Sequence, residues 1–543
     1  MQKSKQNLSY PRQRMSNLLN DNNNDINSNN NNKNTDSTMI NIENNSTKQY
    51  HQDHDLDYEN KTSSSLRYKI YLLTFVIYIL VIGNRVSLSI IKSTLLKTFP
   101  PFSMEQNKEQ GIYLLGWLDT CFLLSYAIGS LFSSIIISKI SRAILLPCSL
   151  AGCGIASLLQ AVAYWKDIHY IEYFFIINIF AGFMQSVIGP LCLTLMTNCF
   201  YPKVSSSSSS SKNNNNNNNN NNTNLKSKFG LIMGLWSSYN GVSSFLFKLI
   251  GSRLLKQYNW GCVFVLPGVL SIVFAMIIFY KWKDNLLFDN IYIIDNNNNY
   301  KTNIKETIKI TTTTASETTI ERIPEITITS FFTIKKAFQI PGVVPYALCL
   351  FFTKLLVYTL SFWLAQFLSL LQFSPTLANN ISSMYDIGGI LGGIFSGWFV
   401  DSFPKRKSIF ITISFLFLIP FFFELKHINS VMGFSLIFFI LFLIGFLLYI
   451  PYVLISSLII NDFQPPDYSS SSSSSSFHHY QYVYGIINGI GGIGAALQGV
   501  ITSYLVNDFG LNSIFYALAI YSFMGALLSI YISWSQYKGN YKK

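Results

Sequence analysis

The segment Tyr71–Leu96 reads YLLTFVIYILVIGNRVSLSIIKSTLL and indicates the fold class of this chain. It exceeds the roughly 20 mostly apolar residues that a helix needs to cross the hydrocarbon core of a bilayer. Arg85 lies deep inside it. A cation in hydrocarbon costs at least about 2.5 kcal/mol, so an arginine at this depth normally faces a polar cavity or a partner. The segment therefore predicts a membrane span that carries a functional cation, and a buried arginine suggests an anionic cargo.

The composition of the whole chain also indicates a membrane protein. Of 543 residues, 49% are hydrophobic and 12% are charged, against about 25% charged residues in soluble domains. The net charge of +13 sits largely in tails and loops, where basic residues set membrane orientation. No basic nucleic-acid-binding motif accompanies it, so we predict no nucleic-acid partner. The seven cysteines show no metal-binding spacing, and we predict no metal and no cofactor.

Apolar runs of spanning length recur along the chain and predict twelve transmembrane helices. The eighth and eleventh spans carry DIGGILGGIFSG and GIINGIGGIGAALQG, whose small residues predict close helix packing. The predicted spans are Tyr68–Leu95, Ile112–Ile137, Ala143–Tyr164, Tyr170–Thr197, Phe229–Ile250, Cys262–Tyr280, Val344–Leu370, Leu377–Val400, Ile409–Phe423, Val431–Ile460, Tyr482–Leu505 and Ile514–Trp534.

Polar stretches divide these spans into two groups of six. The division predicts an all-α membrane protein of two six-helix bundles, a layout typical of alternating-access transporters that bind cargo between the bundles. The low-complexity tracts are rich in Asn or Ser, cannot lie in hydrocarbon, and predict loops. The predicted parts are a disordered Asn-rich cytosolic tail (1–65), a first bundle (66–281, insert 203–228), a cytosolic linker (282–340), a second bundle (341–535, insert 463–480) and a cytosolic tail (536–543).

Basic residues in the loops predict the orientation. Lys139 and Arg142 follow the second span, and Lys405, Arg406 and Lys407 follow the eighth. The excess of Lys and Arg in these loops places both termini in the cytosol.

One of these loops carries a recognisable motif. In GWFVDSFPKRK, Gly397, Asp401 and Lys405 stand at four-residue steps. This resembles the signature loop of the major facilitator superfamily, in which the acid caps or pairs at a helix end and helps to latch one conformation. The equivalent loop of the first bundle has lost the acid and carries, at the same spacing, Ser134, Ser138 and Arg142.

Longer sequence motifs make the resemblance more specific. In order along the chain, they cover about Lys69–Trp534 and are similar to spans of the eukaryotic sugar-phosphate exchangers, in the organophosphate:phosphate antiporter branch of that superfamily. These glucose-6-phosphate or glycerol-3-phosphate transporter-like words are GWLDTCFLLSYAIGS (Gly116–Ser130), GLIMGLWSSYNGVSS (Gly230–Ser244), NWGCVFVLPGVLSIV (Asn259–Val273), LCLFFTKLLVYTLSFWLAQFL (Leu348–Leu368), MYDIGGILGGIFSGWFVD (Met384–Asp401) and NGIGGIGAALQGVI (Asn488–Ile501).

The resemblance implies the major facilitator fold and the exchange of a sugar phosphate for inorganic phosphate. It also implies residence in the endoplasmic reticulum membrane, with the plasma membrane as the alternative. Related transporters hold phosphate with basic residues on the first and seventh spans, and the first-span arginine matches Arg85. The family commonly has lysine directly after this arginine, whereas this chain has Val86.

Helical spacing adds candidate cargo ligands. Arg85, Ser89 and Lys92 share one face of the first span, and the planar fork of the guanidinium suits phosphate. Lys92 either assists Arg85 or snorkels to the interface. On the seventh span Lys354 and Tyr358 share a face. Lys354 is either the second cargo cation or half of a structural ion pair with a buried acid.

Asp119 and Asp386 are two acids that we expect to be buried within spans. They neutralise the cargo cations in the empty state, bind a proton in a symporter, or form structural pairs between helices. Lys248 and Arg253 lie late in the fifth span, where snorkelling accounts for both. Four aromatic residues are either sugar contacts or packing and interface residues: Tyr126, Trp236, Tyr239 and Trp363.

These observations favour a transporter that exchanges a sugar phosphate for inorganic phosphate across a lipid bilayer. The alternatives are a symporter for another organic anion and a transport-inactive sensor or scaffold. We predict no enzyme and no catalytic residue, because no histidine lies in mid-span and no phosphate-cradling GxxxxGK[ST] loop is present.

Overall fold

The computed structural model describes residues 35–103, 108–200, 228–283, 338–428, 432–458 and 473–538. The chain divides into two compact units, Met1–Tyr68 and Lys69–Lys543. In the described residues of the first unit the chain is helical from Thr35 onward. The second unit holds the membrane region.

Each of the twelve predicted spans corresponds to one or two helices in the described residues. The first bundle contains α2 (Thr35–Thr98), α3 (Lys108–Lys139), α4 (Arg142–Trp165), α5 (Ile171–Phe200), α7 (Phe229–Ser237), α8 (Tyr239–Gln257) and α9 (Trp260–Lys283). The second contains α12 (Val343–Leu370), α13 (Pro375–Ser402), α14 (Lys407–Leu425), α15 (Phe434–Val453), α16 (Ser473–Phe509) and α17 (Leu511–Tyr537), with η1 (Pro404–Arg406) and η2 (Leu454–Leu458) as short turns.

Ten of these helices are long and apolar enough by themselves to cross a membrane. The fifth span is divided, because α7 ends and α8 begins at Ser238, whose hydroxyl donates to the carbonyl of Leu235 at 2.7 Å. Such a local hydrogen bond competes with the regular helical pattern. The tenth span ends in the π-helical turn η2 shortly after Pro451, a residue that has no N–H to donate.

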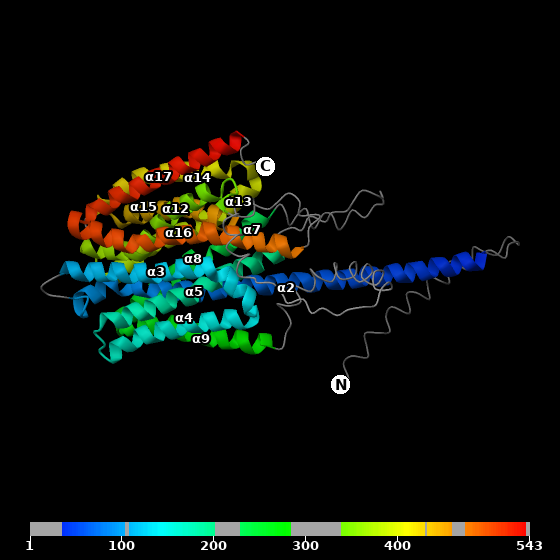
Figure 1. The fold of residues 1–543 in the computed structure, drawn as a ribbon, viewed down its shortest axis with the longest axis horizontal. Coiled ribbons are helices and arrows are strands. Elements are labelled where there is room, and N and C mark those ends of the chain that lie inside the picture. Colours follow the sequence, from blue (N-terminus) through cyan, green and yellow to red (C-terminus); the bar gives the residue numbers. More distant parts are fainter. Residues whose placement is uncertain are drawn as a thin grey trace, which may run out of the picture. The chain divides into compact units, whose positions relative to one another are not determined.

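The bundles pack internally and also against each other. In the first, α4 contacts α5 and α9, and α3 contacts α5; in the second, α12 contacts α16 and α17, and α13 contacts α15. Between the bundles, α3 lies along α16, and α13 lies along both α7 and α8. Figure 1 shows the later helices α12–α17 grouped together, with α16 next to α3.

Glycines make the contacts between bundles close. A side chain at Gly499 would collide with the backbone oxygen of Gly116, and one at Gly397 with the backbone oxygen of Gly230. The predicted close packing of the eighth and eleventh spans is therefore confirmed.

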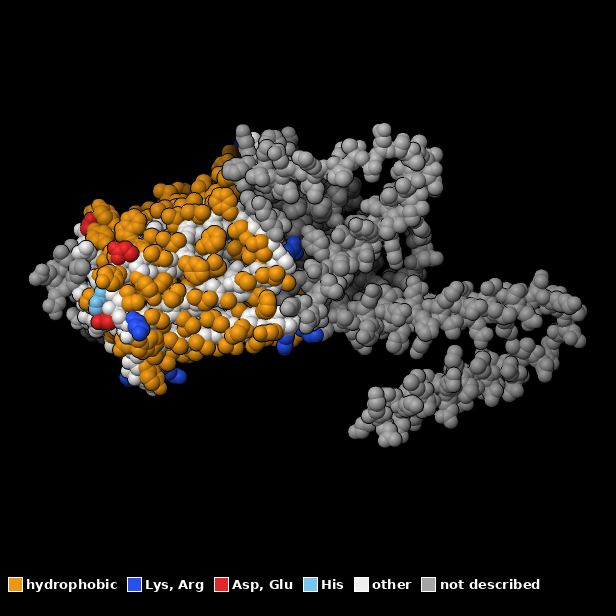
Figure 2. All heavy atoms as spheres, turned by 60° about the horizontal axis from the view of Figure 1, so that its bottom comes forward, with side chains coloured by type: hydrophobic (Ala, Val, Ile, Leu, Met, Phe, Trp, Pro, Cys, Tyr) orange, Lys and Arg blue, Asp and Glu red, His pale blue; other side chains and the backbone are white. Residues whose placement is uncertain are grey.

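The outer surface fits a bilayer. Large apolar side chains are exposed along many helices, among them Ile176, Phe417, Phe439 and Ile520. Figure 2 shows one face on which hydrophobic side chains cover the middle, while the visible charged groups gather toward the ends. The chain is a multi-pass membrane protein.

Two predicted loop boundaries differ from the structure. We predicted a disordered tail over 1–65, but α2 already begins at Thr35. We also predicted a loop for the serine tract, but α16 begins within it at Ser473. At Ser473 the helix of the eleventh span continues into the serine tract, where each further helical residue adds one hydrogen bond. Residues 1–34, 104–107, 201–227, 284–337, 429–431, 459–472 and 539–543 lie outside the described residues.

Candidate functional site

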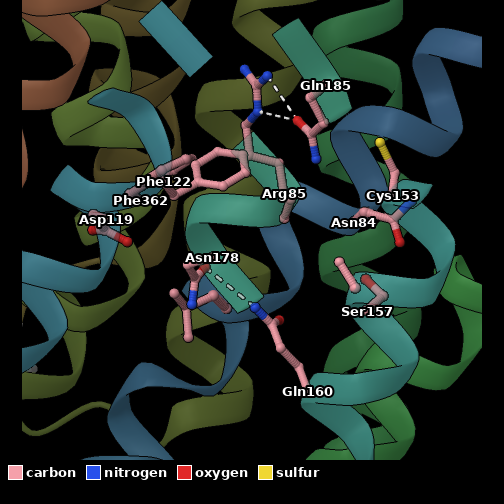
Figure 3. A pocket seen from close by; sticks show the side chains of 13 residues that line it. Asn84, Arg85, Asp119, Phe122, Cys153, Ser157, Gln160, Asn178, Gln185 and Phe362 are labelled. Atoms are coloured by element: carbon pink, nitrogen blue, oxygen red, sulfur yellow. Dashed lines mark hydrogen bonds between the residues drawn. The ribbon is translucent and has the colours of Figure 1, made fainter. Parts of the chain in front are cut away.

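Arg85 is buried near the junction of the two bundles. Its Nε and Nη2 both donate to the side-chain oxygen of Gln185 on α5, at 3.1 and 2.9 Å. Its Nη1 donates to the hydroxyl of Tyr358 on α12, at 2.6 Å, and the ring of Tyr126 lies 4.9 Å from its Cζ. Within the described residues Arg85 forms no ion pair. Figure 3 shows the guanidinium turned toward Gln185.

Lys354 lies on α12, one turn before Tyr358. Its side chain is 3% exposed. The ammonium donates to the side-chain oxygen of Asn488 on α16, and to the backbone oxygen of the same residue at 3.3 Å. No acid pairs with Lys354 in the part of the chain that the structure describes.

The two buried acids pair with other cations. Asp119 on α3 pairs with Lys92 on α2, and Asp386 on α13 pairs with Lys248 on α8 at 2.7 Å. Asp386 thus forms a pair between helices, one of the predicted alternatives, and Asp119 neutralises Lys92 rather than Arg85 or Lys354. Lys92 is fully buried and already paired, so it neither snorkels nor offers a free charge to cargo. Snorkelling is also wrong for Lys248, which is 1% exposed.

A charge balance follows from these pairings. Six charged side chains are buried among the described residues: Arg85, Lys92, Asp119, Lys248, Lys354 and Asp386. Two cations are matched by two acids, while Arg85 and Lys354 have neutral partners. Among the described residues, two buried basic side chains, one from each bundle, therefore have no acid beside them.

The remaining predicted ligands take several roles. Ser89 donates to the carbonyl of Phe362 on α12 at 3.0 Å, so it joins the two bundles. Tyr239 stacks on Tyr78 with ring centroids 4.0 Å apart. Trp363, predicted as a sugar contact, instead lies over the ammonium of Lys92, 4.0 Å from its ring centre.

A small polar cavity adjoins Arg85. Figure 3 shows its wall, to which α4 and α5 contribute Ser157, Gln160, Asn178 and Gln185. Gln160 donates to the side-chain oxygen of Asn178 at 3.2 Å. The cavity volume is about 20 Å³, which is room for an ordered water and too small for a sugar phosphate. Sequence reasoning missed these residues, although amides inside the third and fourth spans were a visible signal.

The signature loop after the eighth span forms a cap. The carboxylate of Asp401 accepts hydrogen bonds from the backbone N–H groups of Gly230 and Leu231, both at 2.7 Å. These groups begin α7 in the first bundle, and Gly397 allows the close approach. The expectation that the acid caps a helix end is therefore confirmed. Lys405 is exposed in η1, and the side chains of Ser134 and Ser138 lie outside the described residues.

Contacts join the bundles at both ends. Asp401 holds the predicted cytosolic end. At the opposite end, Tyr113 on α3 donates to Asp508 on α16 at 2.6 Å, and Asn379 on α13 donates to the carbonyl of Ile90 on α2 at 3.1 Å. Since the described contacts close the seam on both sides, opening either side requires the bundles to part there.

Two helical bundles that enclose buried cations at their junction define a membrane transporter. The family model of the Major Facilitator Superfamily matches residues 73–477, and the chain belongs to this superfamily.

Relatives agree with the resemblance to sugar-phosphate exchangers. The chain is 29% identical over 500 residues to a protein named putative glycerol-3-phosphate transporter 5 from Arabidopsis thaliana, with 89% of this chain and 94% of the relative covered. It is 27% identical over 495 residues to the glucose-6-phosphate exchanger SLC37A2 from Bos taurus, covering 84% and 92%. The Xenopus tropicalis protein of that name is 29% identical over 452 residues, covering 80% and 82%.

Proposed function

We propose that this transporter exchanges a sugar phosphate, of the glucose-6-phosphate or glycerol-3-phosphate class, for inorganic phosphate by alternating access. The observation that carries the proposal is the pair of buried cations without an acid, Arg85 and Lys354. A buried charge is costly unless it is paired. A doubly charged phosphate group between the bundles would match both.

The chemistry of the two cations suits phosphate. The guanidinium of Arg85 presents a planar fork of donors, and its Nη1 is held here by the hydroxyl of Tyr358. Phosphate oxygens would replace this neutral acceptor and form stronger, charge-assisted hydrogen bonds. Lys354 supplies a compact point charge beside it.

The position of the cations also supports alternating access. Arg85 belongs to the first bundle and Lys354 to the second, so an anion that contacts both favours the closed state over either open state. A cargo shifts such an equilibrium by its differential affinity for the two states. Both phosphate and sugar phosphate carry the required group, which accounts for exchange.

The family resemblance supports the endoplasmic reticulum as the membrane of residence. Colocalisation of a tagged chain with a marker of that membrane tests this part of the proposal. A signal confined to the plasma membrane would instead favour the alternative location.

Counterflow in proteoliposomes tests the exchange. Vesicles loaded with phosphate should take up labelled sugar phosphate from a panel that includes the matching plain sugars, which should not enter. Arg85→Ala should abolish uptake while the protein still reaches the membrane. Arg85→Lys should also be poor, because an ammonium lacks the fork of donors.

Three results would contradict the proposal. They are uptake by Arg85→Ala near the parent rate, uptake of plain sugars at the rate of their phosphates, and uptake that needs a proton gradient but no internal phosphate. The last would indicate a symporter for an organic anion. Binding of labelled phosphate without any counterflow would indicate the sensor or scaffold.

A further inference from the structure

The buried cations fall into two classes according to the partner that holds them. Lys92 and Lys248 each pair with a carboxylate. Arg85 and Lys354 are each held by a carboxamide, Gln185 and Asn488 respectively. We infer that Gln185 and Asn488 are positioning residues that set the charge of the cargo, because they orient the two cations without neutralising them.

The geometry at Gln185 supports this role. One oxygen accepts from both Nε and Nη2 of Arg85, at 3.1 and 2.9 Å, which fixes the plane of the guanidinium. Gln185 is 2% exposed, so bulk water does not compete for these bonds. The edge that bears Nη1 is left to face the second bundle, where it reaches Tyr358 at 2.6 Å.

The geometry at Asn488 is equivalent in the other bundle. Its side-chain oxygen accepts from the ammonium of Lys354, and its Nδ2 lies 3.4 Å from the hydroxyl of Ser130 on α3. Asn488 is 4% exposed. One amide thus links the cation of the second bundle to a helix of the first.

A carboxylate at either position would change the electrostatics but hardly the shape. Glutamate and aspartate have nearly the shape of glutamine and asparagine, yet each would form a buried ion pair with its cation. The site would then present one positive charge in place of two. Amides at these positions therefore favour a cargo with two negative charges. This inference rests on the proposed exchange of phosphate compounds.

The test replaces each amide by its acid. Gln185→Glu and Asn488→Asp are assayed for uptake of labelled glucose 6-phosphate into phosphate-loaded vesicles, with KM measured at several external pH values. A phosphate monoester loses its second proton at about pH 6 and is mainly a dianion at neutral pH. Asn380→Asp is the control, since it makes the same change from amide to acid at an exposed position on α13 and contacts no cation among the described residues.

The parent should bind less well as the pH falls and the cargo becomes a monoanion. Each acid variant should raise KM about tenfold or more at neutral pH. The expected change corresponds to losing the free energy of one hydrogen bond to a charged group. The KM of each acid variant should also depend much less on pH than that of the parent. The difference in KM between variant and parent should therefore become smaller at acidic pH. Asn380→Asp should keep the pH profile of the parent.

Gln185→Met separates orientation from charge. It removes the acceptor but leaves the positive charge, so it should weaken uptake while retaining the pH profile of the parent. The inference is overturned if both acid variants follow the parent profile, or if the control Asn380→Asp shows the same flattening of the pH profile. If the parent itself shows no counterflow, the proposed function fails instead, and the two failures are thereby distinguished.

Discussion

The ion pair between Lys248 and Asp386 offers a quantitative test of the seam between the bundles. The pair joins α8 to α13 at 2.7 Å, with the two side chains 1% and 0% exposed. Asp386→Asn removes the negative charge and leaves Lys248 buried beside an amide. Removal of one partner from a buried pair costs about 3–5 kcal/mol. We therefore expect a marked loss of stability in Asp386→Asn.

A double-mutant cycle assigns that loss to the pair. Lys248→Met combined with Asp386→Asn removes both charges, and an apolar replacement of a buried pair is often nearly neutral. The double variant should recover most of the stability that the single variant loses. The assay is thermal unfolding of the purified protein in detergent at a fixed scan rate, because unfolding of large proteins is commonly irreversible and rate-dependent.

An exposed contact at the same seam is the control. Asp508→Asn weakens the exposed hydrogen bond from Tyr113, and its unfolding temperature should stay close to that of the parent. If Asp386→Asn also unfolds at the parent temperature, or if the double variant is no more stable than the single one, the pair does not hold the bundles as argued.

The remaining predictions concern other contacts of the seam and the site. Asp401→Ala should weaken the cap on α7 by about 0.5–2 kcal/mol, measured as faster labelling of a cysteine introduced near Gly230 by a membrane-impermeant thiol reagent. Gly397→Val should abolish exchange, because its side chain would collide with the backbone of α7; parent-like counterflow would refute that packing argument. Trp363→Ala should destabilise the protein, because it uncovers the Lys92 ammonium; thermal unfolding is the measurement, and an unchanged unfolding temperature would contradict it.

Much of the fold followed from the sequence, because the bilayer imposes a simple rule on spans. Each backbone polar group in hydrocarbon must be satisfied within the helix, so apolar runs of sufficient length predict helices directly. All twelve predicted spans correspond to helical segments in the described residues. The boundaries at Thr35 and Ser473 did not follow, since composition does not show how far a helix continues beyond the membrane.

The candidate site followed in part. Arg85 and Lys354 were predicted from a charge within an apolar run, which is visible along the chain. Their amide partners were not, because Gln185 is 100 residues from Arg85 and Asn488 is 134 residues from Lys354. Pairing between helices was one predicted alternative for Asp119 and Asp386, but the particular lysine partners did not follow from the sequence, since such a pairing depends on the rotation and depth of the helices in the packed bundle.

The interruption at Ser238 has a mechanical meaning. Before Ser238, the short helix α7 is held to the second bundle by Asp401. After Ser238, α8 is held to it by the ion pair between Lys248 and Asp386. In a single continuous helix, a displacement at one of these contacts would be transmitted directly to the other. Because α7 and α8 are separate helices, the contact of Asp401 with α7 would be able to break while the pair of Lys248 with Asp386 stays intact, as a transporter that opens one side at a time requires.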